Sequence, residues 1–434
     1  MRLSLKNLST VYKQIKNHDG LYLPDFNRNI FKLRDTYEDI LNVNYTNNSL
    51  LNDLEIKKVL SKKDCLDSKN ILHFTIDSLG INRLKSKKIF LNEYIENNEI
   101  IEISSLFPTI TSTIMLSIYS GIPPENHGIL GHKIFFPELG AIMDTLRLSI
   151  PGAKNDEKDS LIKAGINAKS LLWEYRPHSL YESEEYKQYN FLASDIAMSG
   201  LSHLMLESHS VVSFRNLVDG FEKLKILLKR NEKMYIHFYI GDIDDISHIY
   251  GPDSEGCENT LDVLNYIFKK FLKSFEKDIA KNTILAITAD HGQNQLLEEN
   301  KIFFKKEEIE SYSKFLKTNM GKSGRVLHFY VKDDKIDEFK EIISEKLGES
   351  ALILTKFDDL TPLFSSKTNY NRLFERLGNL IIIFKPSYSS EKEYENEKEE
   401  PIEFKMKGTH GSLSQDELLI PWIIDKLETF QKFL

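Results

Sequence analysis

The sequence ITADHGQNQ at residues 287–295 places an acid and an imidazole, Asp290 and His291, at the end of an apolar run. Carboxylate oxygen and imidazole nitrogen are both ligands of Zn²⁺ in proteins. Adjacent residues of a strand point to opposite faces, so both side chains can contact one ion only if the chain turns directly after Asp290. Gly292 permits such a turn. The pattern indicates either a surface turn before the next helix or two ligands of one metal ion.

A second acid–imidazole pair lies in GDIDDISHIYGPDSEG, residues 241–256. Asp244 and His248 are four residues apart, which places them on one face of a helix and within reach of one ion. Asp242 and Asp245 are rival acids that lack this spacing to His248. Taken alone, the pair is more typical of an ordinary surface contact between an acid and a histidine.

A third candidate ligand is His410, in KGTHGSLSQDELLIPWII at residues 407–424. It lies between two glycines in a loop, and the apolar residues that follow predict a helix. A lone histidine in such a loop is usually structural or exposed. Together with Asp244 and His248, however, it completes a set of two imidazoles and one carboxylate, which with an open position is the pattern of catalytic zinc.

Candidate nucleophiles lie in SSLFPTITSTIMLSIYSGIPPENHGILG, residues 104–131, where hydroxyl side chains follow Pro108 and precede an apolar run that predicts a helix. The free N–H groups and positive dipole end of a helix N-terminus favour an alkoxide and a bound phosphate. Ordinary capping by Ser or Thr is the alternative. The hydroxyl residues are Thr109, Thr111, Ser112 and Thr113.

These residues need a sheet that brings them to one edge. Short apolar runs predict buried parallel strands, and amphipathic stretches between them predict helices, an alternation that favours a mostly parallel sheet covered on both faces. Ligand sites of such sheets lie beyond the carboxyl ends of the strands. Runs that end on Asp77, Asp242 to Asp245, and Asp290 would place mutually repelling acids there unless cations lie among them. The predicted strands are 70–77, 234–242, 282–290 and 379–384, and the helices are 216–230 and 259–281.

The chain of 434 residues is long enough for one large α/β domain with an insertion. We expect a three-layer α/β/α sandwich whose core spans residues 67–320 and 376–434. Residues 1–66 are polar and partly helical and predict an N-terminal helical extension. Residues 321–375 combine a strand, a helix and a strand, which predicts an inserted β-α-β lid or subdomain.

Composition excludes several classes of protein. The formal net charge is −8 and no long basic stripe is present, which argues against binding to duplex nucleic acid. Neither Cys65 nor Cys257 belongs to a CxxC pair, which excludes a cysteine-based zinc ribbon. No apolar segment reaches bilayer or signal-peptide length. We therefore expect a protein of the cytoplasm that acts without a membrane. The sequence leaves its oligomeric state open.

Four motifs in this order, FPTITST…SGIPPENHGILG, D…SHIYGP, ADHG and GTHG, resemble the alkaline phosphatase superfamily, and within it the nucleotide pyrophosphatase/type I phosphodiesterase branch. The resemblance runs in patches from about residue 70 to 425. It implies an alkaline phosphatase-like fold, Thr111 as the nucleophile and two divalent metal ions, zinc or else manganese or magnesium. By this resemblance one metal site consists of Asp77, Thr111, Asp290 and His291, and the other of Asp244, His248 and His410.

The chain departs from the family at two positions. The family commonly has an Asn three residues after the nucleophile, where this chain has Ile114, and a Gly where this chain has Ser247. The first departure removes a polar side chain near the expected phosphate. Ser112, Thr113 or a backbone N–H group is expected to take that role.

The resemblance implies a two-metal hydrolase that cleaves phosphodiester or pyrophosphate bonds of small nucleotide-like substrates through a threonyl-phosphoryl intermediate. A phosphomonoesterase or phosphonate hydrolase of the same superfamily is the alternative within the class. A non-catalytic protein that binds metal and phosphate is the alternative outside it. The segment around Thr111 contains no Arg to hold extra phosphate charge, which favours diesters.

Overall fold

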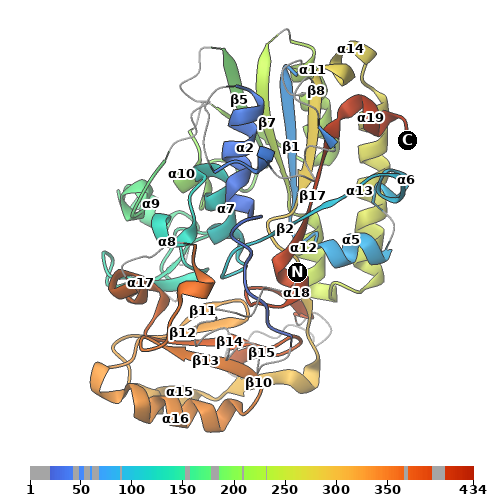
Figure 1. Ribbon diagram of the computed structural model, residues 1–434. Coiled ribbons are helices and arrows are strands. Elements are labelled where there is room, and N and C mark those ends of the chain that lie inside the picture. The colour runs from blue at the N-terminus through green and yellow to red at the C-terminus, as the bar shows by residue number, and fades with distance from the viewer. Residues whose placement is uncertain are drawn as a thin grey trace.

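The computed structural model describes residues 20–42, 48–52, 59–60, 68–87, 90–151, 157–176, 185–207, 210–230, 232–365, 370–392 and 406–434. Figure 1 shows a large sheet with helices around it and a second sheet below. Within the described ranges, none of the helices is both long and apolar enough to span a lipid bilayer.

The central sheet has seven strands in the order β2-β17-β8-β1-β7-β5-β6. Neighbouring strands of this sheet pair in parallel, except that β17 runs antiparallel to both β2 and β8. Every residue of β1 and β8 is buried, which explains why their sequences are mostly apolar rather than alternating between apolar and polar residues. The predicted mostly parallel sheet is confirmed. The strands are β1 Asn70–Ile76, β2 Ile101–Ser104, β5 Tyr186–Ala193, β6 Val211–Phe214, β7 Lys233–Ile240, β8 Thr283–Thr288 and β17 Leu419–Lys426.

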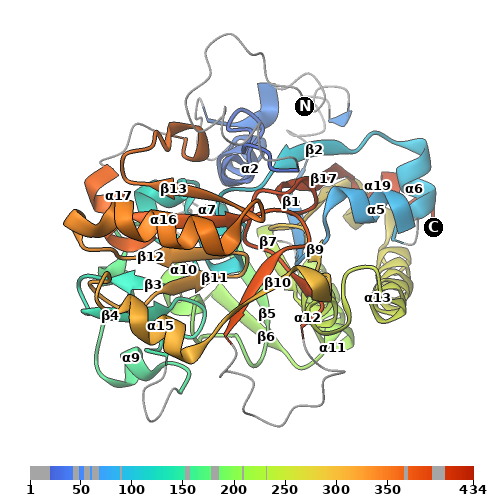
Figure 2. The same ribbon diagram turned by 90° about the horizontal axis from the view of Figure 1, so that it is seen from below.

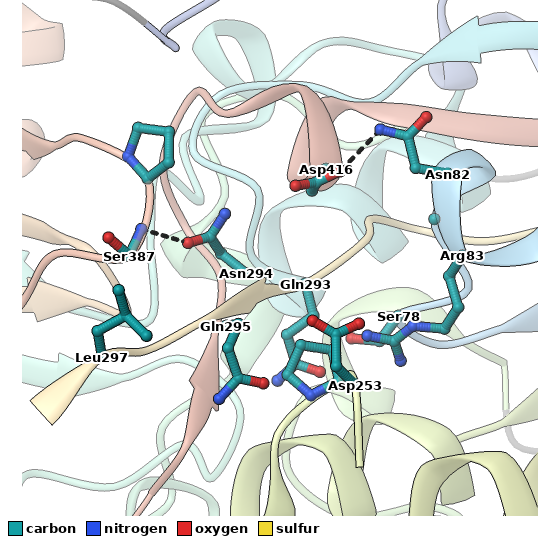
Figure 3. Close-up of a pocket in the computed structure, with 13 residues that line it drawn as sticks. Ser78, Asn82, Arg83, Asp253, Gln293, Asn294, Gln295, Leu297, Ser387 and Asp416 are labelled. Atoms are coloured by element: carbon teal, nitrogen blue, oxygen red, sulfur yellow. Dashed lines mark hydrogen bonds between the residues drawn. The ribbon is translucent and has the colours of Figure 1, made fainter. Parts of the chain in front are cut away.

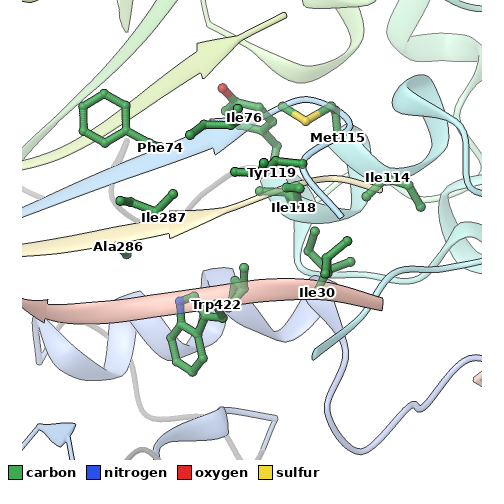
Figure 4. Close-up of a cluster of buried hydrophobic side chains, with 14 of the residues drawn as sticks. Ile30, Phe74, Ile76, Ile114, Met115, Ile118, Tyr119, Ala286, Ile287 and Trp422 are labelled. Atoms are coloured by element: carbon green, nitrogen blue, oxygen red, sulfur yellow. The ribbon is translucent and has the colours of Figure 1, made fainter. Parts of the chain in front are cut away.

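Helices cover both faces of this sheet and give the predicted three layers (Figure 1). Near Trp422 of β17, the apolar face of α7 (Thr111–Ser120), with Met115 and Ile118, packs in the core together with Ile30 (Figure 4). On the other face, Phe74 of β1 contacts phenylalanines of α11 (Leu217–Leu228) and α13 (Glu255–Lys273). The predicted helices at 216–230 and 259–281 are confirmed, the second as α13 followed by α14 (Lys277–Lys281).

The predicted N-terminal extension is described only in part. Helix α2 (Leu33–Ile40) lies beside α7, and its Tyr37 hydroxyl accepts a hydrogen bond from Trp422 Nε1 at 3.1 Å. The further helices of the core are α5 Ile81–Lys87, α6 Asn92–Asn97, α8 Pro124–His127, α9 Ser160–Lys163, α10 Ser202–Met205, α12 Asp242–Tyr250, α18 Gln415–Leu418 and α19 Leu427–Gln431.

The second sheet is antiparallel and has six strands in the order β13-β14-β12-β11-β3-β4. Helices α15 (Lys306–Tyr312) and α16 (Ile336–Leu347) lie on its outer side, away from the central sheet (Figures 1 and 2). The strand, helix and strand predicted within 321–375 are present as β12, α16 and β13. The strands are β3 Lys133–Phe136, β4 Ala141–Asp144, β11 Gly321–Ser323, β12 Val326–Phe329, β13 Ala351–Thr355 and β14 Leu380–Phe384.

The prediction that 379–384 is a parallel strand of the core is wrong. The segment forms β14, which pairs antiparallel with β12 and β13. A short apolar run identifies a buried strand but carries no information about which sheet the strand joins. Since β3, β4 and β14 lie outside 321–375, the second sheet is larger than the predicted insertion. The division at residues 66/67, 320/321 and 375/376 stays a prediction.

The apolar helix predicted after His410 is also wrong. Only the short α18 follows the loop, and the apolar residues then form β17 in the central sheet. A fully buried strand and a buried helix give the same unbroken apolar run.

Two small sheets complete the fold. One pairs β9 (Asn294–Gln295) with β16 (Gly408–Thr409), and the other pairs β10 (Lys301–Phe304) with β15 (Ser389–Lys392). Helix α17 spans Tyr370–Leu377.

Candidate metal centre and active site

Three neighbouring strands of the central sheet deliver the acidic candidates to one edge. Asp77 directly follows β1, Asp290 follows β8, and Asp244 lies in the first turn of α12, which begins directly after β7. Because β8, β1 and β7 are adjacent and parallel, their carboxyl ends meet. The sequence-based expectation that these acids converge is confirmed.

The first group consists of Asp77, Asp290, His291 and Thr111. His291 Nε2 lies 3.5 Å from Asp77 Oδ1, 3.3 Å from Asp290 Oδ2 and 3.1 Å from Thr111 Oγ1. One ligand atom each from the two acids and the histidine lies within 4.8 Å of the others, close enough to hold one ion. All three side chains are buried.

Gly292 allows the chain to place Asp290 and His291 together, though by close packing rather than by an unusual backbone angle. A Cβ atom at Gly292 would meet the backbone oxygen of Asp416 at 1.9 Å and Cα of Gly80 at 2.9 Å. Gly292 N–H also donates to Glu417 O at 3.0 Å. A side chain here would push the turn away from its neighbours and displace His291.

The second group consists of Asp244, His248 and His410. Asp244 and His248 lie on α12, and Asp244 Oδ2 is 3.2 Å from His248 Nε2. His410 Nε2 is 3.8 Å from the other oxygen, Asp244 Oδ1. Asp244 and His410 also group with His291 within 4.8 Å, so His291 lies between the two groups. The ring centroids of His291 and His410 are 3.8 Å apart and stacked.

The three histidines share one orientation. Their Nδ1 atoms face backbone carbonyls, His248 toward Gly408 O at 2.8 Å, His410 toward Thr109 O at 2.6 Å and His291 toward Gly292 O at 3.0 Å. A proton on Nδ1 leaves the Nε2 lone pair free to bind a cation. Since each Nε2 points toward the carboxylates, the orientation suits metal binding.

The charge balance of the first group calls for a cation. Asp77 Oδ1 and Asp290 Oδ2 are buried and have no hydrogen-bond partner among the described residues. Burial, together with repulsion from Asp290, raises the pKa of Asp77 well above its usual range, and burial raises the pKa of Asp290 to about 6. The Tyr239 hydroxyl donates a hydrogen bond to Asp77 Oδ2, but it is neutral and so does not offset the negative charge of the carboxylates. Ions with oxygen and nitrogen ligands fit this donor set.

The second group is electrostatically different. Burial disfavours the charged form of Asp244, but the adjacent His248 and His410 outweigh it and hold the pKa of Asp244 below its usual range. Burial lowers the pKa of His410 to about 3 and the pKa of His291 to about 4, so both rings are neutral near pH 7. Ser78 Oγ donates to Asp244 Oδ1 at 2.5 Å.

The structure separates Thr111 from the other hydroxyl candidates. Thr111 is the first residue of α7, whose N-cap residue, Ile110, makes no side-chain capping bond. Thr109 Oγ1 instead donates to Ser412 O at 3.0 Å and accepts from Gly411 N–H at 2.8 Å. Thr111 is part-exposed, whereas Thr109 is buried. Thr111 is therefore the hydroxyl that reaches the acidic cluster.

The remaining candidates lie beneath Thr111. Ser112 Oγ bonds Thr145 Oγ1 at 2.6 Å, and Thr113 Oγ1 is buried without a hydrogen-bond partner among the described residues. Ile114, at the departure from the family pattern, is buried in the apolar core. The substrate-binding roles of Ser112 and Thr113, like the seven ligand assignments, stay predictions.

Sequence reasoning missed a buried ion pair that holds the site loops. Arg325, next to the β11–β12 turn, donates from Nη1 to Glu417 Oε2 at 2.5 Å, and both side chains are fully buried. Arg325 N–H also donates to His410 O at 2.9 Å, while Glu417 accepts from the backbone of Ser412 and Ser414. No local pattern marks Arg325 in the sequence, because its partner is distant along the chain.

Comparison with known proteins places this site in context. A family model described as Type I phosphodiesterase / nucleotide pyrophosphatase matches residues 71–413. Ectonucleotide pyrophosphatase/phosphodiesterase family member 3 from Mus musculus is 21% identical over 196 residues, which is 44% of this chain and 20% of that protein. The Bos taurus protein is 23% identical over 194 residues, with the same coverage. The alignments thus span a fifth of the curated relatives.

Solved structures share the fold. Murine ectonucleotide pyrophosphatase/phosphodiesterase 5 superposes with a TM-score of 0.60 at 16% identity, covering 82% of this chain and 87% of that one. The human protein gives a TM-score of 0.58 with the same identity and coverage. An inactive Thr-to-Ala variant of the murine protein, in complex with AMP, gives 0.57 at the same identity and coverage.

Proposed function

Because the chain belongs to the type I phosphodiesterase/nucleotide pyrophosphatase family, we propose that it hydrolyses phosphodiester or pyrophosphate bonds of small nucleotide-like substrates with Thr111 as its nucleophile. One observation carries the proposal. Thr111 Oγ1 is a part-exposed hydroxyl at the start of α7 and lies 3.1 Å from His291 Nε2, beside two buried carboxylates. The murine structural neighbour that is inactive as a Thr-to-Ala variant and binds AMP supports the same roles for a threonine and a nucleotide.

Two divalent cations complete the proposed site. Asp77, Asp290 and His291, with Thr111, would hold one, and the second set would hold the other: Asp244, His248 and His410. Zinc suits the nitrogen and oxygen donors, and manganese or magnesium are the alternatives. Bound cations would lower the pKa of the Thr111 hydroxyl and neutralise charge on the phosphoryl oxygens.

The protein's own groups then divide the reaction into two displacements. Thr111 Oγ, having lost its proton to solvent, attacks phosphorus, and the bond to the leaving oxygen breaks as that oxygen takes up a proton. The threonyl phosphoester that forms is hydrolysed by water, which restores the Thr111 hydroxyl and releases the phosphate monoester. His410 and His248, held through Nδ1, keep Asp244 in place beside this centre.

The N-terminus of α7 is suited to receive a phosphoryl oxygen. Its first N–H groups carry the positive end of the helix dipole, and Ile110 provides no side-chain cap. The Ser112 hydroxyl is already bonded to Thr145, which favours backbone N–H groups over that hydroxyl. These groups would take the place of the polar side chain that Ile114 lacks.

The preference for diesters distinguishes this function from its closest alternative, a phosphomonoesterase or phosphonate hydrolase. A dianionic monoester requires an additional cationic group, and residues 104–131 around Thr111 contain no arginine. The predicted cytoplasmic location stays a prediction, since the curated relatives are ectoenzymes by name. A small phosphate ester is the partner we propose.

The test compares bis-p-nitrophenyl phosphate with p-nitrophenyl phosphate as substrates after chelation and after return of Zn²⁺ or Mn²⁺. We expect hydrolysis only with metal, and kcat/KM at least about tenfold higher for the diester, a difference of about 1.4 kcal/mol in transition-state binding. A tenfold preference for the monoester would contradict the proposal. Hydrolysis that survives complete removal of metal would contradict it as well.

A further inference from the structure

A cavity of about 390 Å³ lies beside the candidate metal centre (Figure 3). It contains none of the seven candidate ligands but borders them, since Ser78 follows Asp77 and donates to Asp244, and Gln293 follows His291 by two residues. Its volume lies within the range of small-molecule sites. The polar residues around it include Ser78, Asn82, Arg83, Asp253, Gln293 and Asp416.

Gln293 is the feature of this cavity that its own surroundings leave unexplained. The residue is 5% exposed, and both its side-chain nitrogen and its side-chain oxygen lack a hydrogen-bond partner among the described residues. Its side chain points into the group formed by Asp253, Ser78 and Arg83 in Figure 3. A buried primary amide without partners is unfavourable, because no hydrogen bond offsets the loss of its contact with water. A ligand that offers one donor and one acceptor side by side would satisfy both atoms.

The other polar groups of the cavity are mostly engaged. Asn82 Nδ2 donates to Asp416 Oδ1 at 2.7 Å, and Ser387 N–H donates to Asn294 Oδ1 at 2.5 Å. The carboxylate of Asp253, in contrast, is exposed and lies close to the Arg83 guanidinium. Gln293 is thus the buried group of this cavity with unused hydrogen-bonding capacity, and Asp253 is an exposed acceptor on the same cavity wall.

The charges in the cavity select against two ligand classes. Arg83 lies close to Asp253, Asp416 and Asp244, and Arg83 Nη1 donates to Ser247 Oγ at 2.9 Å. A phosphate or carboxylate would meet these acids, and a metal ion would meet the guanidinium. A neutral ligand with N–H donors encounters neither repulsion. Pro252, Pro386 and Leu297 provide apolar walls for the faces of a flat ring.

We propose that this cavity binds a neutral heterocycle that carries an exocyclic amino group beside a ring nitrogen, the edge that adenine presents. The Gln293 amide would pair with this edge through two hydrogen bonds, as Gln side chains pair with adenine in other recognition sites. The Asp253 carboxylate would accept the second amino hydrogen. This site does not require the proposed hydrolysis, because the ligand carries no phosphate.

The test uses a ligand pair that differs only in the amino group. Adenosine and purine riboside are titrated separately into the full chain by isothermal calorimetry. We expect adenosine to bind with a dissociation constant below about 1 mM, and about tenfold or more tightly than purine riboside. Equal affinity for both nucleosides overturns the proposal. So does the absence of detectable adenosine binding at about ten times this upper limit of the dissociation constant.

Variants then locate the binding. Gln293→Leu and Asp253→Asn are each expected to weaken adenosine binding by about tenfold or more, and Asp253→Asn to reduce the preference over purine riboside. Gln293→Leu removes an unpaired buried amide, so its melting temperature is expected to stay level or rise. Asp262→Asn on the exposed face of α13 is the matched control and should bind normally. Binding that survives in Gln293→Leu but is lost in Thr111→Ala would place adenosine in the hydrolytic site and refute the proposal, whether or not the protein hydrolyses diesters.

Discussion

The second sheet differs in its buried polar groups from the proposed catalytic edge, the edge of the central sheet where β8, β1 and β7 end beside the candidate metal ligands. In the second sheet, His328 bonds Leu377 O and Ser323 Oγ, and the Tyr330 hydroxyl donates to Arg376 O. At the catalytic edge, Asp77 Oδ1, Asp290 Oδ2 and both amide atoms of Gln293 have no hydrogen-bond partner among the described residues. Burial raises the unfavourable energy of such open groups.

Buried polar groups that have hydrogen-bond partners stabilise the fold, whereas the unpartnered groups at the catalytic edge are available to bind a ligand. A satisfied buried network stabilises one packing of two elements. Unsatisfied buried carboxylates that face each other are tolerated where a ligand will satisfy them. The second sheet reaches the catalytic edge through Arg325, which bonds both Glu417 and the His410 carbonyl. Variants in the two regions should therefore fail in different ways, those at the catalytic edge in activity and those of the second sheet in stability.

The largest effect is expected from Asp290→Asn at the catalytic edge. Loss of one charge from the first ligand group should lower kcat/KM on the order of 10³-fold or more, about 4 kcal/mol of barrier. The metal-free variant should nevertheless melt at the same or a higher temperature than metal-free wild type, because a buried, repelled carboxylate is gone. Steady-state rates measure the change in kcat/KM, and calorimetry of the chelated protein measures the melting temperature. A large fall in the melting temperature of the chelated variant would remove the distinction between the two regions.

Arg325→Met should act through stability instead. It leaves Glu417 buried without its cation, which costs about 3–5 kcal/mol of unfolding free energy. Urea denaturation at constant m-value measures the change. The double variant Arg325→Met with Glu417→Gln should recover part of the loss, because the uncompensated charge is removed. If Arg325→Met is as stable as wild type, the buried Arg325–Glu417 ion pair does not hold the site loops as described.

A smaller effect separates two neighbouring threonines. Thr109→Val removes two buried hydrogen bonds, to Ser412 and from Gly411, and should cost about 2 kcal/mol. Thr113→Val, the matched control, replaces a hydroxyl that is buried without a partner among the described residues and should be neutral or slightly stabilising. Thermal denaturation of both variants decides. Equal destabilisation would mean that the Thr113 hydroxyl is satisfied in solution.

The last effect is the acid response of the second sheet, which develops gradually as the pH falls. Burial lowers the pKa of His328 to about 4, below its unfolded value near 6.5. Protons then bind the unfolded chain first, so the stability from this residue is complete above pH 6.5 and is lost as pH falls toward 4, at up to about 1.4 kcal/mol per pH unit. His328→Gln should flatten the melting temperature between pH 7 and 5. An unchanged pH profile in the variant would show that His328 does not titrate as stated.

The sequence allowed the catalytic edge to be predicted in more detail than the second sheet. Asp77, Asp244 and Asp290 follow or adjoin strands that are mostly apolar, and parallel strands bring their carboxyl ends together without further information. The i, i+4 spacing of Asp244 and His248 requires only that α12 be a helix. These relations depend on local periodicity and on one general rule of sheet geometry, so they could be read before the structure was known.

Residues that depend on distant pairing could not be read in the same way. The run 379–384 is a buried strand in either sheet, and its pairing with β12 is a long-range choice. The residues of β17 form an unbroken apolar run that a buried helix would share. Arg325 and Glu417 are 92 residues apart, and neither has a local motif. The unpartnered amide of Gln293 likewise becomes visible only when the atoms around it are known.

The central claim is that Thr111 forms the covalent bond to phosphorus, and trapping this adduct tests it most directly. Wild-type protein with Zn²⁺ is quenched in acid during turnover of bis-p-nitrophenyl phosphate, digested and analysed by mass spectrometry, with Thr111→Ala in parallel. We expect a phosphoryl adduct on Thr111, and in Thr111→Ala no adduct, a rate lower on the order of 10³-fold or more, and retained metal, because Asp77, Asp290 and His291 remain. An adduct on Thr109 or Thr113, or near wild-type turnover by Thr111→Ala, would contradict the account.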